Sequence, residues 1–190
     1  MDNRKFFNDL AHKWDEISIH DKNKLTKIIE LSEIKPNARI LDIGTGTGVL
    51  IKYLLEKSPS HIHAVDISEN MIAIAKTKYN DNRVKFTNID VHQLKESGFD
   101  YIFLYSVYPH FQDKDALFSH LKSMLNEDGK IVIAHSQSKE AINSVHRENE
   151  NTKNDKLPPV EVTAEIMSKY FKINKTVDNS DMYYISGINK

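Results

Sequence analysis

The sequence predicts an α/β fold with a doubly wound, mostly parallel sheet of seven strands, helices on both faces and an antiparallel C-terminal strand. Five short apolar segments alternate with segments whose apolar residues repeat at helical spacing. This alternation is typical of a parallel sheet built by right-handed crossovers. Two further apolar segments, 171–177 and 182–188, flank the turn residues 178–181 and indicate a closing hairpin. The length of 190 residues suits a single domain over 1–190.

The first 35 residues indicate two helices. Apolar residues repeat at helical spacing from Phe6 to about Ile17, and a second helix is expected over 22–33. We expect residues 1–35 to form a helical lid on the sheet. Trp14, the one tryptophan, either anchors the first helix on the domain or lies over a bound ligand.

The rest of the chain supplies the sheet and its covering helices. Ser68, Asp113 and Ser138 are the expected N-caps of three helices, because their side chains can accept hydrogen bonds from the first helical turn. The predicted strands are 40–43, 61–66, 84–89, 99–105 and 130–135, and the last predicted helix is 163–170. Residues 147–160 are polar and predict a long flexible loop within the domain, which either covers a pocket or forms a solvated surface.

A glycine-rich turn follows the first strand. Gly44, Gly46 and Gly48 alternate directly after an apolar strand that contains Asp42, and an amphipathic segment comes next. Glycine lets the backbone adopt positive φ and approach a ligand closely. The following helix N-terminus offers unpaired N–H groups. The turn therefore predicts a ligand site.

Acidic residues at three strand ends narrow the choice of ligand. Asp66 lies about twenty residues beyond the glycines, where an acid can accept hydrogen bonds from ribose hydroxyls. The spacing departs from the dinucleotide pattern G-x-G-x-x-G, because the third glycine is Gly48 and Val occupies position 49. Asp42 would also repel a diphosphate. These features favour a ribose-bearing cofactor that is positive or zwitterionic and has no phosphate.

The ordered set of motifs from about residue 38 to 145 resembles the class I S-adenosylmethionine-dependent methyltransferases. The motifs are residues 40–48, 65–68, 88–90, 99–100 and 129–133. The N-terminal helix and the closing hairpin resemble the small-molecule branch of that family. The resemblance implies a Rossmann-like fold, S-adenosylmethionine as cofactor and a small-molecule acceptor. It also implies that the cofactor contacts are Asp42, Gly44, Thr45, Gly46, Gly48, Asp66, Ile67, Met71, Asp90, Val91, Tyr105 and Ser106.

The acceptor side is expected in the segment 105–111, after the fourth strand. This segment lacks the Asn-Pro-Pro-Tyr tetrapeptide that the family uses on amide or ring nitrogens, which argues against methylation of protein glutamine or DNA adenine. His110, His135 and Tyr108 are the catalytic candidates. Methyl transfer from a sulfonium is an in-line displacement, so a base is needed only for a protonated acceptor.

Several histidines are expected near the carboxyl edge of the sheet. His110 follows the fourth strand, His135 ends the fifth and His146 lies on the next helix, while His12 could reach the edge from the N-terminal helix. Three interpretations stay open: ordinary polar pocket residues, one general base, or ligands of a metal or metallated substrate. No metal-binding residue is assigned.

Composition excludes other classes of function. The net charge is -1, with 26 basic and 27 acidic residues and no basic block, which disfavours nucleic-acid binding. The absence of cysteine excludes disulfides and thiolate chemistry. Without an apolar N-terminal segment or membrane-length apolar run, a cytoplasmic protein with no membrane partner is expected. The oligomeric state is open. The alternatives are an NAD-dependent oxidoreductase and a non-catalytic S-adenosylmethionine-binding module.

Overall fold

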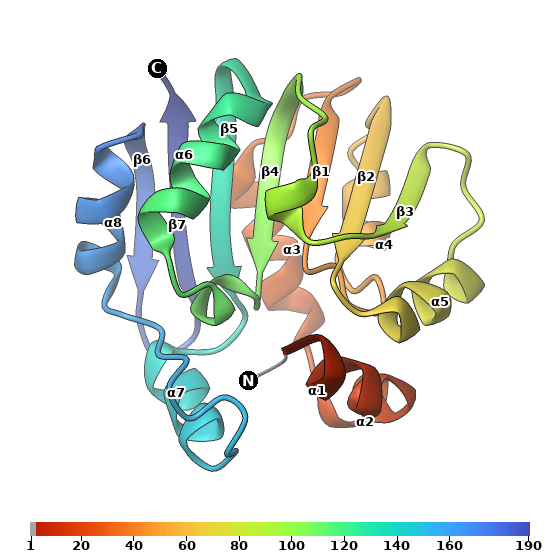
Figure 1. Cartoon of the computed structure of the whole chain (residues 1–190). Helices are drawn as coiled ribbons and strands as arrows, with labels where there is room; N and C mark the ends of the chain where they lie inside the picture. The colour runs from red at the N-terminus through yellow and green to blue at the C-terminus, as the bar shows by residue number, and fades with distance from the viewer. Residues whose placement is uncertain (1–2) are drawn as a thin grey trace.

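The computed structural model describes residues 3–190, and within this range the strands form one seven-stranded sheet in the order β3-β2-β1-β4-β5-β7-β6. Helices cover both faces of the sheet (Figure 1). β7 pairs antiparallel with both β5 and β6, whereas the other pairings are parallel, so the predicted fold class is confirmed. The strands are β1 (Arg39–Ile43), β2 (His61–Asp66), β3 (Val84–Asn88), β4 (Phe99–Tyr105), β5 (Leu125–His135), β6 (Phe171–Asp178) and β7 (Tyr183–Asn189).

The helices after the lid region fall where the apolar periodicity predicts them, apart from their ends. Ser68, Asp113 and Ser138 each accept a hydrogen bond from a backbone N–H in the first turn, as expected for N-caps. α8 begins three residues before its predicted start, behind Pro159. The helices are α4 (Ile51–Leu55), α5 (Glu69–Lys78), α6 (Lys114–Met124), α7 (Lys139–Arg147) and α8 (Val160–Ser168).

The central strands are buried on both faces. Successive side chains of a strand point to opposite faces of the sheet. In β1, Leu41 and Ile43 therefore pack in one hydrophobic cluster and Ile40 packs in the other. This burial on both faces explains why the strands appear in the sequence as continuous apolar runs. Because β1, β2 and β4 pair in parallel, their carboxyl ends lie at one edge of the sheet, where the glycine-rich turn leaves β1.

The N-terminal region differs from the expected single helix. It consists of α1 (Asn3–Leu10), a 3₁₀ turn η1 (Ala11–Lys13) and α2 (Trp14–Ile17), followed by α3 (Lys22–Ser32). Residues 1–2 of the predicted lid lie outside the described residues. Figure 1 shows α1 and α2 beyond the carboxyl end of the sheet, near α5. The break at η1 bends the chain across this edge.

Hydrogen bonds attach the N-terminal region to the loops of the sheet. Asn8 Oδ1 accepts from Ser68 Oγ at 2.5 Å and from Asn70 N at 3.2 Å. Asp15 Oδ1 accepts from Thr47 Oγ1 at 2.6 Å, next to the glycine-rich turn. The two short helices are thereby fixed to the elements that carry the ligand-site motifs.

Two loops have more structure than the sequence suggests. The predicted turn 126–129 bulges out of the pairing between β4 and β5, because Phe99 pairs with Leu125 while Tyr101 pairs with Lys130. In the predicted loop 147–160, Thr152, Asp155 and Leu157 are buried. In the part of the chain that the structure describes, no helix is both long and apolar enough to span a membrane.

Candidate functional site

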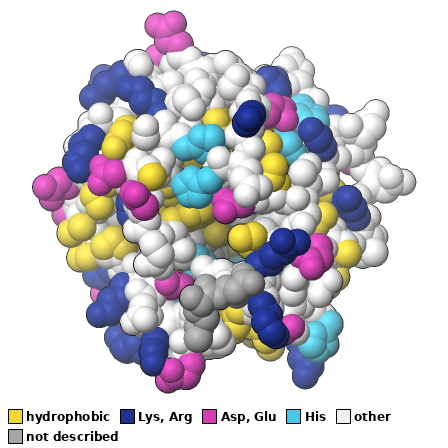
Figure 2. Space-filling model, in the orientation of Figure 1, with side chains coloured by type: hydrophobic (Ala, Val, Ile, Leu, Met, Phe, Trp, Pro, Cys, Tyr) yellow, Lys and Arg dark blue, Asp and Glu magenta, His cyan; other side chains and the backbone are white. Residues whose placement is uncertain are grey.

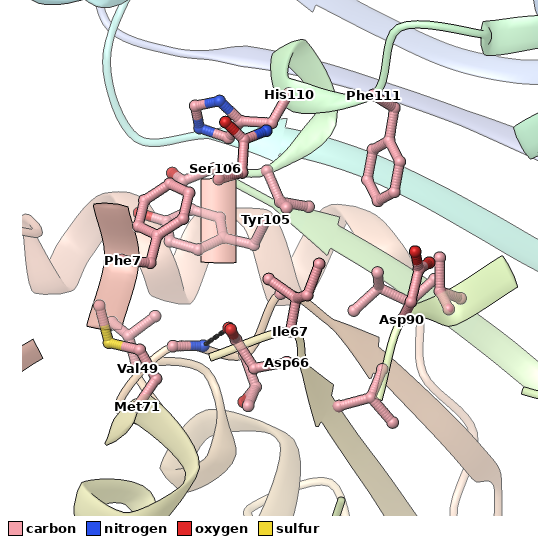
Figure 3. Close-up of a pocket in the computed structure, with 18 of the residues that line it drawn as sticks. Phe7, Val49, Asp66, Ile67, Met71, Asp90, Tyr105, Ser106, His110 and Phe111 are labelled. Carbon is pink, nitrogen blue, oxygen red and sulfur yellow. Dashed lines mark hydrogen bonds between the residues drawn. The ribbon is translucent and has the colours of Figure 1, made fainter. Parts of the chain in front are cut away.

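A cavity of about 310 Å³ lies at the carboxyl edge of the sheet, between the glycine-rich turn and the N-terminal helices. We call it the first cavity. In Figure 3, Asp66 and Met71 lie at one end of it and Ser106 and His110 at the other. It is lined by Asn3, Phe7, Trp14, Ser18, His20, Ile43, Gly44, Thr45, Gly46, Val49, Val65, Asp66, Ile67, Met71, Ile89, Asp90, Val91, His92, Tyr105, Ser106, Val107, His110, Phe111 and Gln112.

The glycine-rich turn forms one wall of the first cavity. Gly44 has φ +66°, and a Cβ there would lie 2.5 Å from Val107 Cγ2. Gly46 has φ +55°, and a Cβ there would meet only the Nε1 of Trp14, at 3.6 Å. Side chains at these positions would strain the backbone and obstruct the turn or the space beneath Trp14. The turn thus presents bare backbone to the cavity.

Asp66 connects β2 to this turn. Its Oδ2 accepts from Gly46 N and its Oδ1 from Ser68 N, both at 2.8 Å; Figure 3 shows the first of these bonds. Asp66 is 8% exposed and lines the first cavity. Burial raises the pKa of Asp66, and the hydrogen bonds from Ser68 and Gly46 oppose that rise. Each carboxylate oxygen has a second lone pair with which to accept from a ligand hydroxyl.

Two of the expected cofactor contacts lie behind the wall. Asp42 is buried and outside the cavity lining, and burial followed by repulsion from Asp66 raises its pKa to about 7. Its place in the centre of β1, between β2 and β4, explains this burial. Gly48 is also outside the lining, because its open side faces the Tyr79 ring, 2.8 Å from an ideal Cβ. The prediction that Asp42 and Gly48 contact the cofactor directly is corrected accordingly.

The lining of the first cavity also contains apolar side chains. Ile67, Met71, Ile89 and Val91 line the cavity, together with Asp90. Asp90 Oδ1 accepts from His92 N at 2.9 Å and so caps the short helix η2 (Val91–Gln93). An apolar slot with one carboxylate suits a flat ring that carries a hydrogen-bond donor.

A second cavity, of about 450 Å³, adjoins the first. Both are lined by Phe7, Trp14, Ser18, His20, Ser106 and His110. The rest of the second cavity is lined by Phe6, Leu10, Ile17, Ile19, His135, Ser136, Gln137, Ile142, Val145, His146, Glu148, Asn149 and Thr152. Its walls therefore come from the N-terminal region, the ends of β4 and β5, α7 and the segment after α7.

His110 lies at the junction of the two cavities and is oriented by a carboxylate. Its Nδ1 is 2.8 Å from Asp155 Oδ2, and Asp155 Oδ1 accepts from Gln112 Nε2 at 2.9 Å. Burial raises the pKa of Asp155, but the hydrogen bonds from His110 and Gln112 and the charge of His110 outweigh it, so the net pKa is lowered. His146 Nδ1 bonds the backbone carbonyl of Asp155. The ring of His110 is thus held by a charged partner.

His135 also lines the second cavity. It is 1% exposed, and neither ring nitrogen has a hydrogen-bond partner among the described residues. Burial and the nearby His110 and His146 lower its pKa to about 3, so the ring is neutral. An unpaired buried polar ring that borders a cavity is suited to bond a ligand.

Two of the other candidates lie away from the cavities. Tyr108 is fully buried and stacks on Phe118, with ring centroids 5.8 Å apart, so it belongs to the core and the prediction of a catalytic role is corrected. The following Pro109 turns the chain, which directs Tyr108 inward and leaves His110 at the junction. His12 lines neither cavity.

His20, which was not among the histidines predicted at the site, belongs to a chain of hydrogen bonds. Tyr105 Oη donates to Ser136 Oγ at 2.7 Å. His20 therefore donates from Nδ1 to Tyr105 Oη, also at 2.7 Å, and its Nε2 accepts from Ser18 Oγ at 2.9 Å. Burial lowers the pKa of His20. These bonds tie the N-terminal region to the ends of β4 and β5.

The histidines do not form a metal site in this structure. Within residues 3–190, no group of three or more His, Asp or Glu side chains is placed to hold a metal ion. The arrangement offers neutral and carboxylate-oriented imidazoles instead. Figure 2 shows hydrophobic side chains in a hollow near the centre of this face, with Lys and Arg dispersed around it among Asp and Glu.

A family model described as "Methyltransferase domain" matches residues 34–185. The chain belongs to this methyltransferase family. It is a member of the class I S-adenosylmethionine-dependent methyltransferases, which confirms the resemblance seen in the motifs. The match covers β1 to β6, the start of β7, the glycine-rich turn and α4 to α8, and leaves out the N-terminal region.

Two named relatives of this methyltransferase domain are similar over part of their length. Phosphoethanolamine N-methyltransferase 2 of Caenorhabditis elegans is 34% identical over 119 residues, which are 60% of this chain and 27% of the relative. Malonyl-[acyl-carrier protein] O-methyltransferase 2 of Ilyobacter polytropus is 34% identical over 134 residues, 67% of this chain and 51% of the relative. The chain thus spans about half or less of the length of these relatives.

Solved structures share the fold of the methyltransferase domain. A chain from the complex of the Haloferax volcanii Trm112 methyltransferase activator with a methyltransferase has a TM-score of 0.86 and 13% identity, covering 99% of this chain and 97% of that chain. Phosphoethanolamine N-methyltransferase 2 of Haemonchus contortus, in complex with S-adenosylmethionine, has a TM-score of 0.75 and 20% identity. The match covers 96% of this chain and 60% of that chain.

The residues of the first cavity fit the cofactor of this methyltransferase family. The bare backbone at Gly44 and Gly46 leaves space beneath Trp14, Asp66 offers free lone pairs to hydroxyls, and the apolar lining residues are accompanied by the carboxylate of Asp90. Lys and Arg are absent from the described lining, as suits a cofactor without phosphate. His20 and Asp155 were not predicted, because neither belongs to a local motif and only the folded chain brings them to the site.

Proposed function

We propose that this domain transfers a methyl group from S-adenosylmethionine to a small-molecule acceptor. The observation that carries the proposal is the junction of two cavities at Ser106 and His110. One cavity has the glycine-rich turn and Asp66, and the other has histidines and aromatic side chains. When bound, the cofactor supplies an electrophilic methyl group.

The first cavity supplies the residues that we assign to the cofactor. Gly44, Thr45 and Gly46 hold its amino-acid part through their backbone, and Asp66 accepts from ribose hydroxyls. Tyr105 and Ser106 border the junction. Ile67, Met71, Asp90 and Val91 enclose its base. Asp42 and Gly48 support the turn from behind.

His110 is the group that we assign as general base. With Nδ1 donating to Asp155, Nε2 is the nitrogen left with a free lone pair, and it can accept a proton from the acceptor. The N-terminal region, as far as it is described, acts as the lid that excludes water from the junction. His135 contacts the acceptor rather than moving its proton, since its pKa of about 3 makes it a weak base.

The named relatives differ in acceptor and in acceptor atom, one being an N-methyltransferase and the other an O-methyltransferase. The acceptor is therefore not carried over from either. The family match favours methyl transfer over the hydride transfer of an NAD-dependent oxidoreductase. The remaining rival is a module that binds the cofactor without turnover.

Incubation with methyl-tritiated S-adenosylmethionine and the low-molecular-mass fraction of a cell extract tests the proposal. We expect label to appear in a small molecule, and to be lost with Asp66→Ala and greatly reduced with His110→Asn. Binding of S-adenosylhomocysteine without any transfer of label would support the non-catalytic module instead. A thermal shift with NAD and none with S-adenosylmethionine would support the oxidoreductase.

A further inference from the structure

The lining of the second cavity has an unusual chemical composition. Eight of its side chains are apolar, namely Phe6, Phe7, Leu10, Trp14, Ile17, Ile19, Ile142 and Val145. Four are imidazoles, namely His20, His110, His135 and His146. Among the described residues no Lys or Arg lines it, and its one acidic lining residue, Glu148, is exposed. The walls therefore offer hydrogen bonds and apolar area without a fixed positive charge.

Cations that flank lining residues in the sequence, such as Lys5, Lys13 and Arg147, are themselves absent from the lining, and Lys139 is engaged elsewhere. Lys139 follows Gln137 of the lining by two positions, yet its Nζ pairs with Glu140 at 2.9 Å and Asp178 at 3.9 Å. The carboxylate of Asp155 lies behind His110 and would repel an anion placed at the junction. A phosphate or carboxylate group bound here would lose its water shell without gaining a fixed cationic partner, which is unfavourable.

Three of the four imidazoles of the cavity are neutral at pH 7, because burial lowers the pKa of His20, His135 and His146 below its ordinary value. His20 is committed to Tyr105 and Ser18, whereas both ring nitrogens of His135 are unpaired. The burial that lowers the pKa of His135 keeps it an uncharged imidazole, with one N–H donor and one acceptor nitrogen. Such a ring satisfies a hydroxyl or amine of a ligand and leaves an ionised oxygen without a charged partner.

The mouth of the cavity is apolar as well. Ile17, Ile19 and Val145 are three of the four large hydrophobic side chains that are exposed on the described part of the molecule, at 55%, 80% and 60%. All three line the second cavity. The fourth, Val162, is 43% exposed on α8 and lines neither cavity. An apolar rim at the cavity mouth extends the apolar surface available to a ligand.

We propose that the acceptor is an uncharged, largely apolar small molecule whose hydroxyl or neutral nitrogen lies at His110 and which forms a hydrogen bond with His135. This inference rests on the proposed function. It distinguishes the acceptor from molecules that carry a phosphate or a free carboxylate. The volume of about 450 Å³ lies within the range of small-molecule pockets.

A matched pair of probes tests the charge preference. The protein saturated with S-adenosylhomocysteine is titrated with para-propylphenol and with para-propylphenyl phosphate at neutral pH, using the fluorescence of Trp14, the one tryptophan, which lines both cavities. We expect the phenol to bind about tenfold or more tightly than its phosphate ester. Equal or tighter binding of the phosphate, or no binding of the phenol, would overturn the inference.

Two variants with an added positive charge test whether the preference for the uncharged phenol arises in the second cavity. Val145→Lys places a cation at the mouth of the second cavity, and we expect it to shift the preference toward the phosphate by about fivefold. Val162→Lys makes the same change at an exposed position on α8 and should leave the preference unchanged. An equal shift in both variants would contradict the assignment of the preference to this cavity.

A third variant tests the hydrogen bond. His135→Phe keeps an aromatic ring but removes both nitrogens, and we expect about a tenfold loss of affinity for para-propylphenol. Affinity for S-adenosylhomocysteine, measured first in each variant, should be unchanged. If S-adenosylhomocysteine binds normally and the phosphate is preferred, this inference fails alone; if S-adenosylhomocysteine does not bind to the unaltered protein, the proposed function fails.

Discussion

His110 Nδ1 and Asp155 Oδ2 lie 2.8 Å apart, although 45 positions separate them in the chain. The carboxylate accepts from the ring, so Nδ1 carries a proton in this bond. Gln112 fixes the second carboxylate oxygen, and His146 bonds the backbone of the same residue. The segment after α7 therefore orients His110, the residue after β4 that we propose as the base.

Asp155→Asn is expected to lower kcat by about tenfold or more, because an amide no longer fixes the tautomer of His110. The rate is measured with the acceptor found by labelling, and nitrogen NMR of the His110 ring should show protonation redistributed between Nδ1 and Nε2. Glu150→Gln is the control in the same segment, since Glu150 pairs with the side chain of Lys153. An unchanged kcat with an unchanged tautomer would remove Asp155 from the account.

Asn8→Ala is expected to speed the release of S-adenosylhomocysteine by about two- to tenfold, because Asn8 Oδ1 joins α1 to Ser68 and Asn70 at the start of α5. Stopped-flow fluorescence of Trp14 measures this release. Asp9→Ala alters the next residue, whose carboxylate pairs with Lys5 on the same helix, and should have little effect. Equal release rates for Asn8→Ala and the unaltered protein would argue that these bonds do not hold the lid.

The raised pKa of Asp42 has a consequence for stability. The folded pKa of about 7 exceeds the ordinary carboxyl value of 3.8, so the folded state binds more protons between these values. The free energy of unfolding therefore falls as pH rises from about 4 to about 7. Asp42→Asn cannot ionise and should escape this loss, gaining up to about 4 kcal/mol relative to the unaltered protein above pH 7. Urea unfolding of the cofactor-free proteins across this range measures the difference, and a difference independent of pH would contradict the shift.

Gly44→Ala and Gly46→Ala are expected to differ in the cofactor-free protein. Both impose a positive φ on alanine, which costs about 1–2 kcal/mol. Only Gly44→Ala also drives a Cβ to within 2.5 Å of Val107, whereas the nearest atom at Gly46 is 3.6 Å away. Thermal unfolding should therefore show the larger loss of stability for Gly44→Ala. Equal losses would mean that Val107 moves aside freely.

Much of the fold follows from local patterns. The bounds of β2 and β4 match the predicted strands to the residue, because buried central strands are continuous apolar runs closed by turn residues. Apolar periodicity did not reveal the break of the N-terminal helix at η1, since the 3₁₀ turn interrupts the helical pattern for only three residues. Gly44, Gly46 and Asp66 were predicted from their local spacing, and all three line the first cavity.

The rest of the site depends on contacts between distant segments. Asp155 lies in a polar segment with no motif, and only the folding of that segment against η3 (Tyr108–His110) brings it to His110. His20 reaches Tyr105 in the same way, across 85 positions. Tyr108 is adjacent to the junction in sequence but points into the core, because the turn at Pro109 separates the directions of neighbouring side chains.

Calorimetric titration with S-adenosylhomocysteine tests the central claim most directly, namely that Asp66 and the glycine-rich turn hold the methyl-donor cofactor. We predict one site per chain in the unaltered protein and a loss of about 1.5–3 kcal/mol of binding free energy for each hydrogen bond removed by Asp66→Ala. Asp90→Ala, in the same cavity lining, should have a smaller effect because one hydrogen bond is lost there. Unchanged affinity in Asp66→Ala, or binding of NAD in preference to S-adenosylhomocysteine, would contradict the account.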